Sequence, residues 1–268
     1  MSRLIGKGAL VLGAANAGNM SQVIARRFRD EGATVIVAGR KMAELNRFAD
    51  EIGGHAIACD VTDRDAVVTM AQEARRILGH VDIAVNGTGW GLVKPFLDTT
   101  VEELKAMTAL QFQGPFYFMQ AMVGVMATDR GGQGGSIIQI SSATAKIMLN
   151  DHAAYMGTKA GTDHVIRCIA NEFGSVGIRA NSISPGLTDT PMNAEAKQIP
   201  GLFESFRSCY PMERWGTSED IAAAAVFLAD EECFMTGENL QVNGGLTLRR
   251  NPNREEINEA VLAASGTA

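Results

Sequence analysis

Short apolar runs alternate with longer segments of helical length along this chain of 268 residues. Seven of the runs have the length of strands and lie at 9–12, 34–38, 56–59, 83–85, 136–140, 179–183 and 239–242. Such runs, with helical segments between the early ones, predict parallel strands that are buried on both faces and joined by right-handed helical crossovers. We therefore predict an α/β fold with a doubly wound, Rossmann-like parallel sheet in a single domain over residues 1–268, and ligands bound after the carboxyl ends of the strands.

The segment 112–126 is expected to be a helix that has almost no polar face. Its apolar residues are Phe112, Phe116, Tyr117, Phe118, Met119, Met122, Val123, Val125 and Met126. A helix of this kind is normally buried on all sides, in a core or in a subunit interface. We therefore expect the protein to form a homo-oligomer, either a dimer or a tetramer.

A hydroxyl, a phenol and an ammonium group are predicted to lie close together after the fifth strand. That strand ends on Ser141 and Ser142. A helix that begins near Ala153 carries Tyr155 and Lys159 four residues apart, which puts both side chains on one helical face. An ammonium near a phenol lowers the pKa of the phenol and makes it a usable general acid or base, and a serine hydroxyl can polarise a carbonyl oxygen. The three groups fit the interconversion of a ketone and an alcohol, although the Tyr-x-x-x-Lys spacing alone is also typical of an ordinary amphipathic helix.

The loop after the first strand predicts a nucleotide-binding turn. Residues 13–28 read GAANAGNMSQVIARRF, a stretch of small residues that runs into a helix. Small residues let the backbone approach a diphosphate, and the N-terminus of the helix offers free N–H groups and a positive dipole. The candidate contacts are Gly13, Asn16, Asn19 and Met20. A tight strand-to-helix turn without a ligand is the alternative interpretation.

Residues after the second, third and fourth strands extend this candidate site. Arg40 follows the second strand, where an acidic residue would accept a hydrogen bond from the ribose of NAD, so NADP is favoured over NAD as the cofactor. Asp60, followed by Val61, comes after the third strand. Its carboxylate is expected either to accept from the adenine amino group or to cap the next helix. Asn86 and Gly87 follow the fourth strand and predict a close backbone contact with the cofactor.

Composition narrows the class of function. The formal net charge is −6, the pI is about 5.3 and the sequence has no basic cluster, which argues against nucleic-acid binding. The four cysteines and four histidines are scattered, so we expect neither a disulfide framework nor a metal site. The apolar run near the start is too short for a signal peptide and is better explained as a buried strand. We expect a cytoplasmic protein that acts on a small-molecule substrate, without nucleic acid or membrane as a partner.

Together these motifs resemble the short-chain dehydrogenase/reductase family, in its short single-domain branch, over about residues 7–245. The residues that carry the resemblance are Asp60-Val61, Asn86-Gly87-Thr88-Gly89, Ser142, Tyr155 with Lys159, Pro185-Gly186 with Thr190, and Val242-Asn243-Gly244-Gly245. The resemblance implies that Tyr155 donates or accepts the proton, that Ser142 polarises the substrate oxygen and that Lys159 holds the nicotinamide ribose. It also implies that the carboxamide is seated by Pro185, Gly186, Thr188 and Thr190, and that Arg40 meets the 2′-phosphate.

The chain departs from the family pattern in two places. The glycine-rich loop is longer than usual and lacks the family's Thr-Gly-x-x-x-Gly-x-Gly pattern, and in this it resembles the enoyl-acyl-carrier-protein reductases of the same family. Those reductases have a wider spacing from tyrosine to lysine, so ketone or alcohol chemistry is favoured here. Gln111 stands where the family has a catalytic asparagine that holds a water in the proton relay. The resemblance implies the same role for the amide of Gln111, on a longer arm.

Residues 190–217 are expected to form a lid over the substrate, and a C-terminal extension follows at about 246–268. The apolar residues of the lid are Met192, Leu202, Phe203, Phe206, Tyr210, Met212 and Trp215, and Trp90, Met148 and Leu149 are expected to form the opposite wall. Aromatic rings and flexible methionines suit a bulky apolar ligand, with ordinary packing of the lid on the core as the alternative. The extension is expected to contain a helix at 254–264 that covers either the active site or a neighbouring subunit.

The sequence therefore predicts an NADP(H)-preferring oxidoreductase that interconverts a secondary alcohol and a ketone on a bulky hydrophobic or aromatic substrate. Two alternatives stay open. One is an NAD-dependent alcohol dehydrogenase. The other is a non-catalytic nucleotide-sensing protein, against which the joint presence of Ser142, Tyr155 and Lys159 argues, because a sensor needs no groups for proton transfer.

Overall fold

A computed structural model describes residues 2–266 and contains one seven-stranded parallel sheet. Its strands are β1 (Gly8–Leu12), β2 (Thr34–Gly39), β3 (His55–Ala58), β4 (Ile83–Asn86), β5 (Gly135–Ile140), β6 (Ile178–Pro185) and β9 (Asn239–Val242). They lie in the order β3-β2-β1-β4-β5-β6-β9, so the direction of strand progression reverses between β1 and β4. In sheets of this kind a ligand binds beyond the carboxyl ends of the strands at that reversal. The predicted doubly wound sheet is confirmed.

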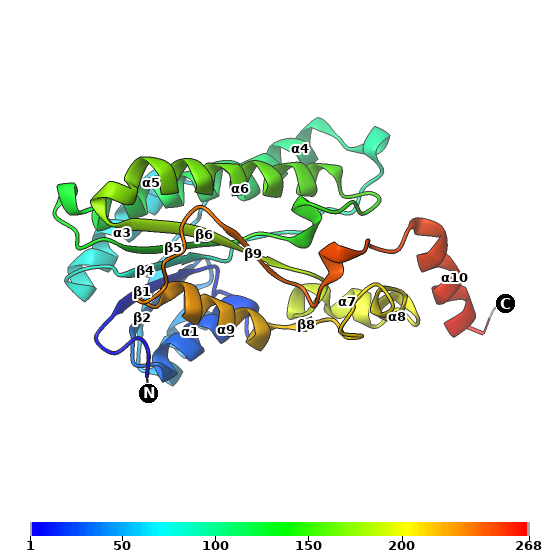
Figure 1. Cartoon of the computed structure of the whole chain (residues 1–268), viewed down its shortest axis with the longest axis horizontal. Coiled ribbons are helices and arrows are strands. Elements are labelled where there is room, and N and C mark those ends of the chain that lie inside the picture. Colours follow the sequence, from blue (N-terminus) through cyan, green and yellow to red (C-terminus); the bar gives the residue numbers. More distant parts are fainter. Residues whose placement is uncertain (1, 267–268) are drawn as a thin grey trace.

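Helices cover both faces of the sheet (Figure 1). One face carries α1 (Met20–Asp30), α2 (Met42–Ile52) and α9 (Ser218–Ala229), and the other carries α3 (Arg64–Leu78), α4 (Val101–Thr108), α5 (Gly114–Met126) and α6 (Ala153–Phe173). Among the described helices, none combines the length and the apolar composition that a transmembrane span requires.

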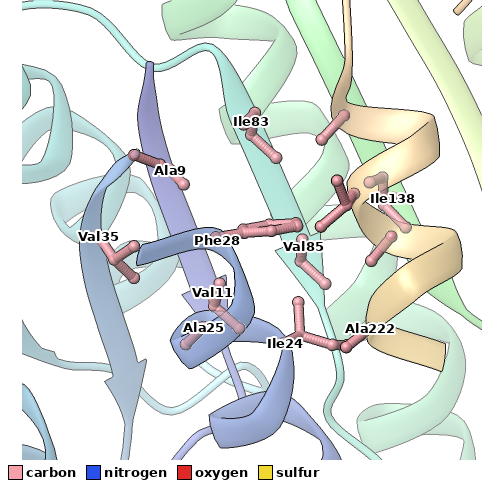
Figure 2. Close-up of a cluster of buried hydrophobic side chains, with 14 of the residues drawn as sticks. Ala9, Val11, Ile24, Ala25, Phe28, Val35, Ile83, Val85, Ile138 and Ala222 are labelled. Atoms are coloured by element: carbon pink, nitrogen blue, oxygen red, sulfur yellow. The ribbon is translucent and has the colours of Figure 1, made fainter. Parts of the chain in front are cut away.

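The core consists of two apolar layers, one on each face of the sheet. On the first face Phe28 of α1 packs over Val11 and Val85 of the central strands (Figure 2). Successive residues of a strand point to opposite faces, so Leu10 belongs to the second layer, together with Phe118 of α5. Burial of each such side chain contributes about 1.5–3 kcal/mol to stability, which explains why the strands read as continuous apolar runs.

The apolar helix expected at 112–126 begins later and is only partly buried. Residues Ala109–Gln113 form a turn of π-helix between α4 and α5. Phe118 and Met122 of α5 are fully buried, whereas Phe116 is 43% exposed. The helix therefore packs on the sheet with one side and presents an aromatic ring on another, and the expected burial of that other side in a subunit interface stays a prediction.

The predicted lid and C-terminal extension pack against each other beyond the sheet (Figure 1). The strands β7 (Thr188–Asp189) and β8 (Gly216–Thr217) pair at the base of the lid and enclose α7 (Ala194–Lys197) and α8 (Leu202–Arg207). The extension forms α10 (Arg254–Ala264), whose Ile257 packs on an apolar cluster with Phe206 of α8. The extension thus packs on the lid of its own chain.

Two polar contacts fasten the extension to the loop that precedes α6. Asn251 is buried, and its Nδ2 donates to the backbone oxygen of Met148 at 3.0 Å. Arg254 forms an ion pair with Asp151. The extension thus links the lid to the loop that leads into the helix of Tyr155.

We expect Gly201→Ala to lower the free energy of unfolding by about 3 kcal/mol. Gly201 precedes α8 with a φ of +80°, and a Cβ there would lie 2.2 Å from the backbone oxygen of Ala260 in α10. Urea-induced unfolding measures the loss. Gly53→Ala is the control, because Gly53 also has a positive φ of +64° but nothing lies within 4 Å of its Cβ position. It should lose only about 1 kcal/mol of backbone strain, and equal losses would contradict the packing of α10 on Gly201.

Candidate active site

Two adjoining hollows lie at the carboxyl ends of the central strands. A cleft of about 520 Å³ is lined by the predicted residues Gly13, Asn16, Asn19, Arg40, Asp60, Val61 and Gly87. A pocket of about 150 Å³ beside it is lined by Asn19, Met20, Gly87, Ser142, Tyr155, Lys159, Pro185, Gly186, Thr188 and Thr190. All the residues predicted for the site therefore line one of these hollows, except Asn86 and Gln111. Those two residues are not part of either lining.

The loop between β1 and α1 is held tightly by its own side chains. Gly13 has a φ of +102°, and a Cβ there would lie 2.8 Å from the backbone carbon of Gly87, so only glycine lets the two loops approach. Asn19 accepts from the backbone N–H of Gln22 at 3.0 Å, and its Nδ2 donates to the backbone oxygen of Gly13 at 2.7 Å. The N-terminus of α1 is thereby fixed at the cleft, where it favours an anionic group.

Gln22 is a supporting residue that the sequence analysis missed. It is buried, its Nε2 donates to the backbone oxygen of Ala14 at 2.9 Å, and its Oε1 accepts from the backbone N–H of Gly18 at 2.9 Å. A signal was present, because Asn19 and Gln22 have the Asn-x-x-Gln spacing of a capping box at the start of a helix.

The buried side chain of Asn86 supports the loop after β4 by hydrogen bonds. It is fully buried, and its Nδ2 donates to Gln139 Oε1 at 3.0 Å. Its Oδ1 accepts from the backbone N–H of Thr88 at 3.1 Å and from the hydroxyl of Thr88 at 2.8 Å. These bonds fix the turn that exposes Gly87 and Gly89 to the hollows, so Asn86 acts on the cleft through the backbone.

Two opposite charges stand at the mouth of the cleft. The side chain of Arg40 is 73% exposed, and its Nη1 lies 3.9 Å from Asp60 Oδ2. Burial opposes ionisation of Asp60, but hydrogen bonds from Thr62 and the charge of Arg40 together lower the pKa of that carboxyl. Asp63 caps α3 by accepting from the backbone N–H groups of the following residues at 2.9 and 3.2 Å, so the capping role considered for Asp60 falls to Asp63.

Ser142, Tyr155 and Lys159 meet in the small pocket as their positions after β5 and on α6 predicted. Ser142 Oγ lies 2.8 Å from Thr144 Oγ1. Lys159 Nζ donates to the backbone oxygen of Ile140 at 2.8 Å and lies 5.7 Å from the centre of the Tyr155 ring. A substrate oxygen in this pocket can therefore meet the hydroxyl of Ser142 and the phenol of Tyr155.

Burial dominates the protonation of this group. It raises the pKa of Tyr155, and the Ser142 hydroxyl opposes the shift only in part. This shift is opposite in direction to the lowering of the Tyr155 pKa that we expected from the ammonium of Lys159. Burial also lowers the pKa of Lys159 to about 8, against the opposing charge of Asp163, and its ammonium is directed to the Ile140 carbonyl. At neutral pH the phenol is consequently protonated and the lysine is mainly cationic.

Gln111 lies behind the pocket, in the π-helical turn. Its Nε2 donates to the backbone oxygen of Trp90 at 2.9 Å, and its own backbone oxygen accepts from the hydroxyl of Thr162 at 2.9 Å. Its Oε1 is buried without a hydrogen-bond partner among residues 2–266. Turns of π-helix are frequent at functional sites, and buried acceptors without a partner are uncommon in folded proteins.

The lid contributes fewer side chains to the hollows than the sequence analysis expected. Phe203, Phe206 and Tyr210 are buried in packing, which was the alternative interpretation. The phenol oxygen of Tyr210 accepts from the backbone N–H of Leu187 at 2.6 Å and so supports the loop after β6. Met192 is 63% exposed and lines both hollows from the lid side.

The residues expected to form the wall opposite the lid line three hollows. Trp90 is 39% exposed and lines both the cleft and the small pocket. Met148 and Leu149 line a neighbouring hollow of about 720 Å³, together with Phe96 and Arg254. Trp90 therefore faces the candidate site directly, whereas the other two expected wall residues lie next to it.

The doubly wound sheet and the two hollows at its carboxyl edge can be compared with those of known proteins. A family model described as enoyl-(acyl carrier protein) reductase matches residues 13–247. A D-threitol dehydrogenase from Mycolicibacterium smegmatis is 32% identical over 253 residues, which cover 92% of this chain and 95% of that protein. A 7alpha-hydroxysteroid dehydrogenase from Escherichia coli is 33% identical over 251 residues, which cover 91% and 95%. The structure of a short-chain type dehydrogenase/reductase from Mycobacterium ulcerans aligns with a TM-score of 0.88 at 27% identity, covering 96% of this chain and 98% of that one.

The chain belongs to the short-chain dehydrogenase/reductase family. It is an NAD(P)-dependent alcohol dehydrogenase or carbonyl reductase.

Proposed function

We propose that the protein is an NADP(H)-preferring oxidoreductase that interconverts a secondary alcohol and a ketone. The observation that carries the proposal is the convergence of Ser142, Tyr155 and Lys159 on one small pocket that adjoins the nucleotide cleft. Tyr155 is the general acid or base, Ser142 polarises the substrate oxygen and Lys159 holds the ribose with its ammonium.

The residues of the two hollows fit a nicotinamide dinucleotide. The diphosphate would lie against Gly13, Asn16, Asn19, Met20 and Gly87, next to the N-terminus of α1, the adenine against Asp60 and Val61, and the carboxamide against Pro185, Gly186, Thr188 and Thr190. When bound, this cofactor supplies or accepts the hydride. Arg40 supports the preference for NADP, because its exposed guanidinium at the cleft mouth suits a 2′-phosphate.

Proton transfer is the contribution of this chain's own side chains. In the direction of reduction, Ser142 and Tyr155 donate hydrogen bonds to the ketone oxygen, and Tyr155 gives its proton to the oxygen as negative charge develops. The raised pKa of Tyr155 keeps the phenol protonated at neutral pH, which suits reduction. Oxidation needs the phenolate, so we propose that its rate rises as the pH rises toward the pKa of Tyr155.

Gln111 supplies a hydrogen-bond acceptor for the relay that reprotonates Tyr155 and Lys159. Its buried Oε1, unpartnered in the described structure, lies 3.5 Å from where a Cβ on Gly89 would be, and Gly89 lines the pocket. We propose that it holds a water in the relay between Lys159 and solvent. The bond from its Nε2 to Trp90 gives it a second role, because it fixes the residue that faces the substrate.

The proposed substrate is bulky and hydrophobic or aromatic. Trp90 and Met192 are partly exposed on the rim of the pocket and give an apolar ligand a flat ring and a flexible side chain to contact. One relative is named for a hydroxysteroid and another for the polyol D-threitol, so a steroid ketone and a sugar ketone are the two decisive test substrates.

Tyr155→Phe is expected to lower kcat for ketone reduction with NADPH by at least about 100-fold, because the proton donor is lost. Binding of NADPH, followed by nicotinamide fluorescence, should stay nearly unchanged. Tyr117→Phe removes a phenol hydroxyl from α5 and serves as the control. If the wild type binds NADPH but turns over no steroid, terpene or sugar ketone, the sensor alternative replaces this function. Faster turnover of the sugar ketone would contradict the bulky hydrophobic substrate.

Arg40→Ala is expected to weaken NADPH binding about tenfold and to leave NADH binding unchanged, since it removes a charged hydrogen bond to the 2′-phosphate. Fluorescence titration with both nucleotides measures the effect. Arg29→Ala, an exposed change on α1, should alter neither affinity. A wild type that prefers NADH would favour the NAD-dependent alternative.

We propose that the protein forms a homo-oligomer, a dimer or a tetramer. Phe116 of α5 is exposed beside a hollow of about 350 Å³ between α5 and α6. Aromatic rings exposed next to a groove are typical of protein interfaces. Sedimentation velocity at micromolar concentration should show species larger than the 28.5 kDa chain, and a 28.5 kDa species alone would contradict the proposal.

A further inference from the structure

Asp163 is a carboxylate of α6 that the proposed reaction does not use. It follows Lys159 by one helical turn, so the two side chains share a face of the helix. Its Oδ2 accepts from Ser141 Oγ at the end of β5 at 2.8 Å and from Asn239 Nδ2 on β9 at 2.9 Å. Its Oδ1 is buried and has no hydrogen-bond partner in the part of the chain that the structure describes.

Apart from Asp163, few groups in the described structure stabilise the positive charge of Lys159. Its side chain belongs to a residue that is 3% exposed, and its Nζ donates to the neutral carbonyl of Ile140. Among residues 2–266 no carboxylate lies within 4.0 Å of this ammonium. Burial lowers the pKa of Lys159 to about 8, and the charge of Asp163 is what opposes a further decrease.

Among residues 2–266, one charged group, Lys159, faces Asp163. It is faced by Ser141, which follows β5, by Ser182 on β6 and by Asn239 on β9. Asn239 Nδ2 also donates to Ser182 Oγ at 2.7 Å. These partners are neutral, and Lys159 is the charged group that faces it. Burial raises the pKa of Asp163, while the hydrogen bonds and Lys159 counteract the rise.

We propose that Asp163 is a positioning residue whose carboxylate, held by Ser141 and Asn239, keeps Lys159 in its ammonium form beside Tyr155. The effect passes through space from one turn of α6 to the next, and Lys159 is the charged group that faces the carboxylate. The consequence for turnover rests on the proposed function, whereas the coupling between the two charges is a property of the fold.

The titration of Lys159 tests this coupling without any substrate. The chain has seven lysines, so protein labelled with ¹³C at lysine Cε gives few NMR signals, and Lys159→Met assigns the one that belongs to Lys159. In Asp163→Asn the midpoint of Lys159 should fall by about one pH unit. Glu172→Gln removes a carboxylate from the exposed end of the same helix and should leave the midpoint unchanged. An unchanged midpoint in Asp163→Asn would overturn the proposal.

Ser141→Ala tests the same coupling with the carboxylate retained. It removes one of the two hydrogen bonds that hold Asp163 Oδ2 and lower the pKa of this carboxyl. The carboxylate is then protonated at a higher pH, so the midpoint of Lys159 should fall by a smaller amount than in Asp163→Asn. This variant decides the question if Asp163→Asn does not fold, and a midpoint that stays in place would then overturn the proposal.

The pH profile of ketone reduction by NADPH separates an electrostatic role from a structural one. In Asp163→Asn the alkaline limb of kcat should shift to lower pH in parallel with the midpoint of Lys159. A uniform loss of kcat at every pH, with the limb in place, would mean that Asp163 only supports the fold and would overturn its positioning role. If the wild type shows no turnover, the proposed function fails, and the NMR midpoint still decides the coupling.

Discussion

Burial of the parallel sheet on both faces is the constraint on which the other features of this structure depend. Helices cover the two faces, so the strand interiors are apolar, and polar groups gather where the strands end. The reversal of strand order between β1 and β4 separates the loops that follow these strands and opens the cleft there. The approach of Gly13 to Gly87 shows how closely the two loops still meet at its base.

The same burial sets the protonation of the candidate site. A group taken out of water loses stabilisation of its charged form, so the pKa of Tyr155 rises and that of Lys159 falls. As a result of these two shifts, the pocket contains a protonated phenol and an ammonium group that loses its proton more readily than a lysine in water. Lys159 depends for its charge on Asp163, which in turn is oriented by side chains from two other elements. Acid–base behaviour at the site is therefore a property of the packed interior.

A second layer, formed by the segment 190–217 and the C-terminal helix, lies beyond the sheet. The lid packs on the C-terminal helix through Phe206 and Ile257, and Arg254 joins that helix to the loop before α6. This arrangement uses most aromatic side chains of the lid for packing and leaves Met192 to line the pocket together with Trp90. The lid is consequently connected, through the C-terminal helix, to the loop that leads into the helix of Tyr155.

The sequence by itself determined the sheet, the strand positions within about one or two residues and the group of side chains that gathers at its carboxyl edge, because apolar periodicity and strand ends are local properties of the chain. Only the tertiary structure decided the burial of Phe203 and Phe206, the support of the β4 loop by Asn86, the bond from Gln111 to Trp90 and the direction of the Tyr155 pKa shift. Each of these depends on which distant segments exclude water from a side chain or supply its hydrogen-bond partner. The spacing of residues along the chain does not determine that environment, which forms only when the chain is packed.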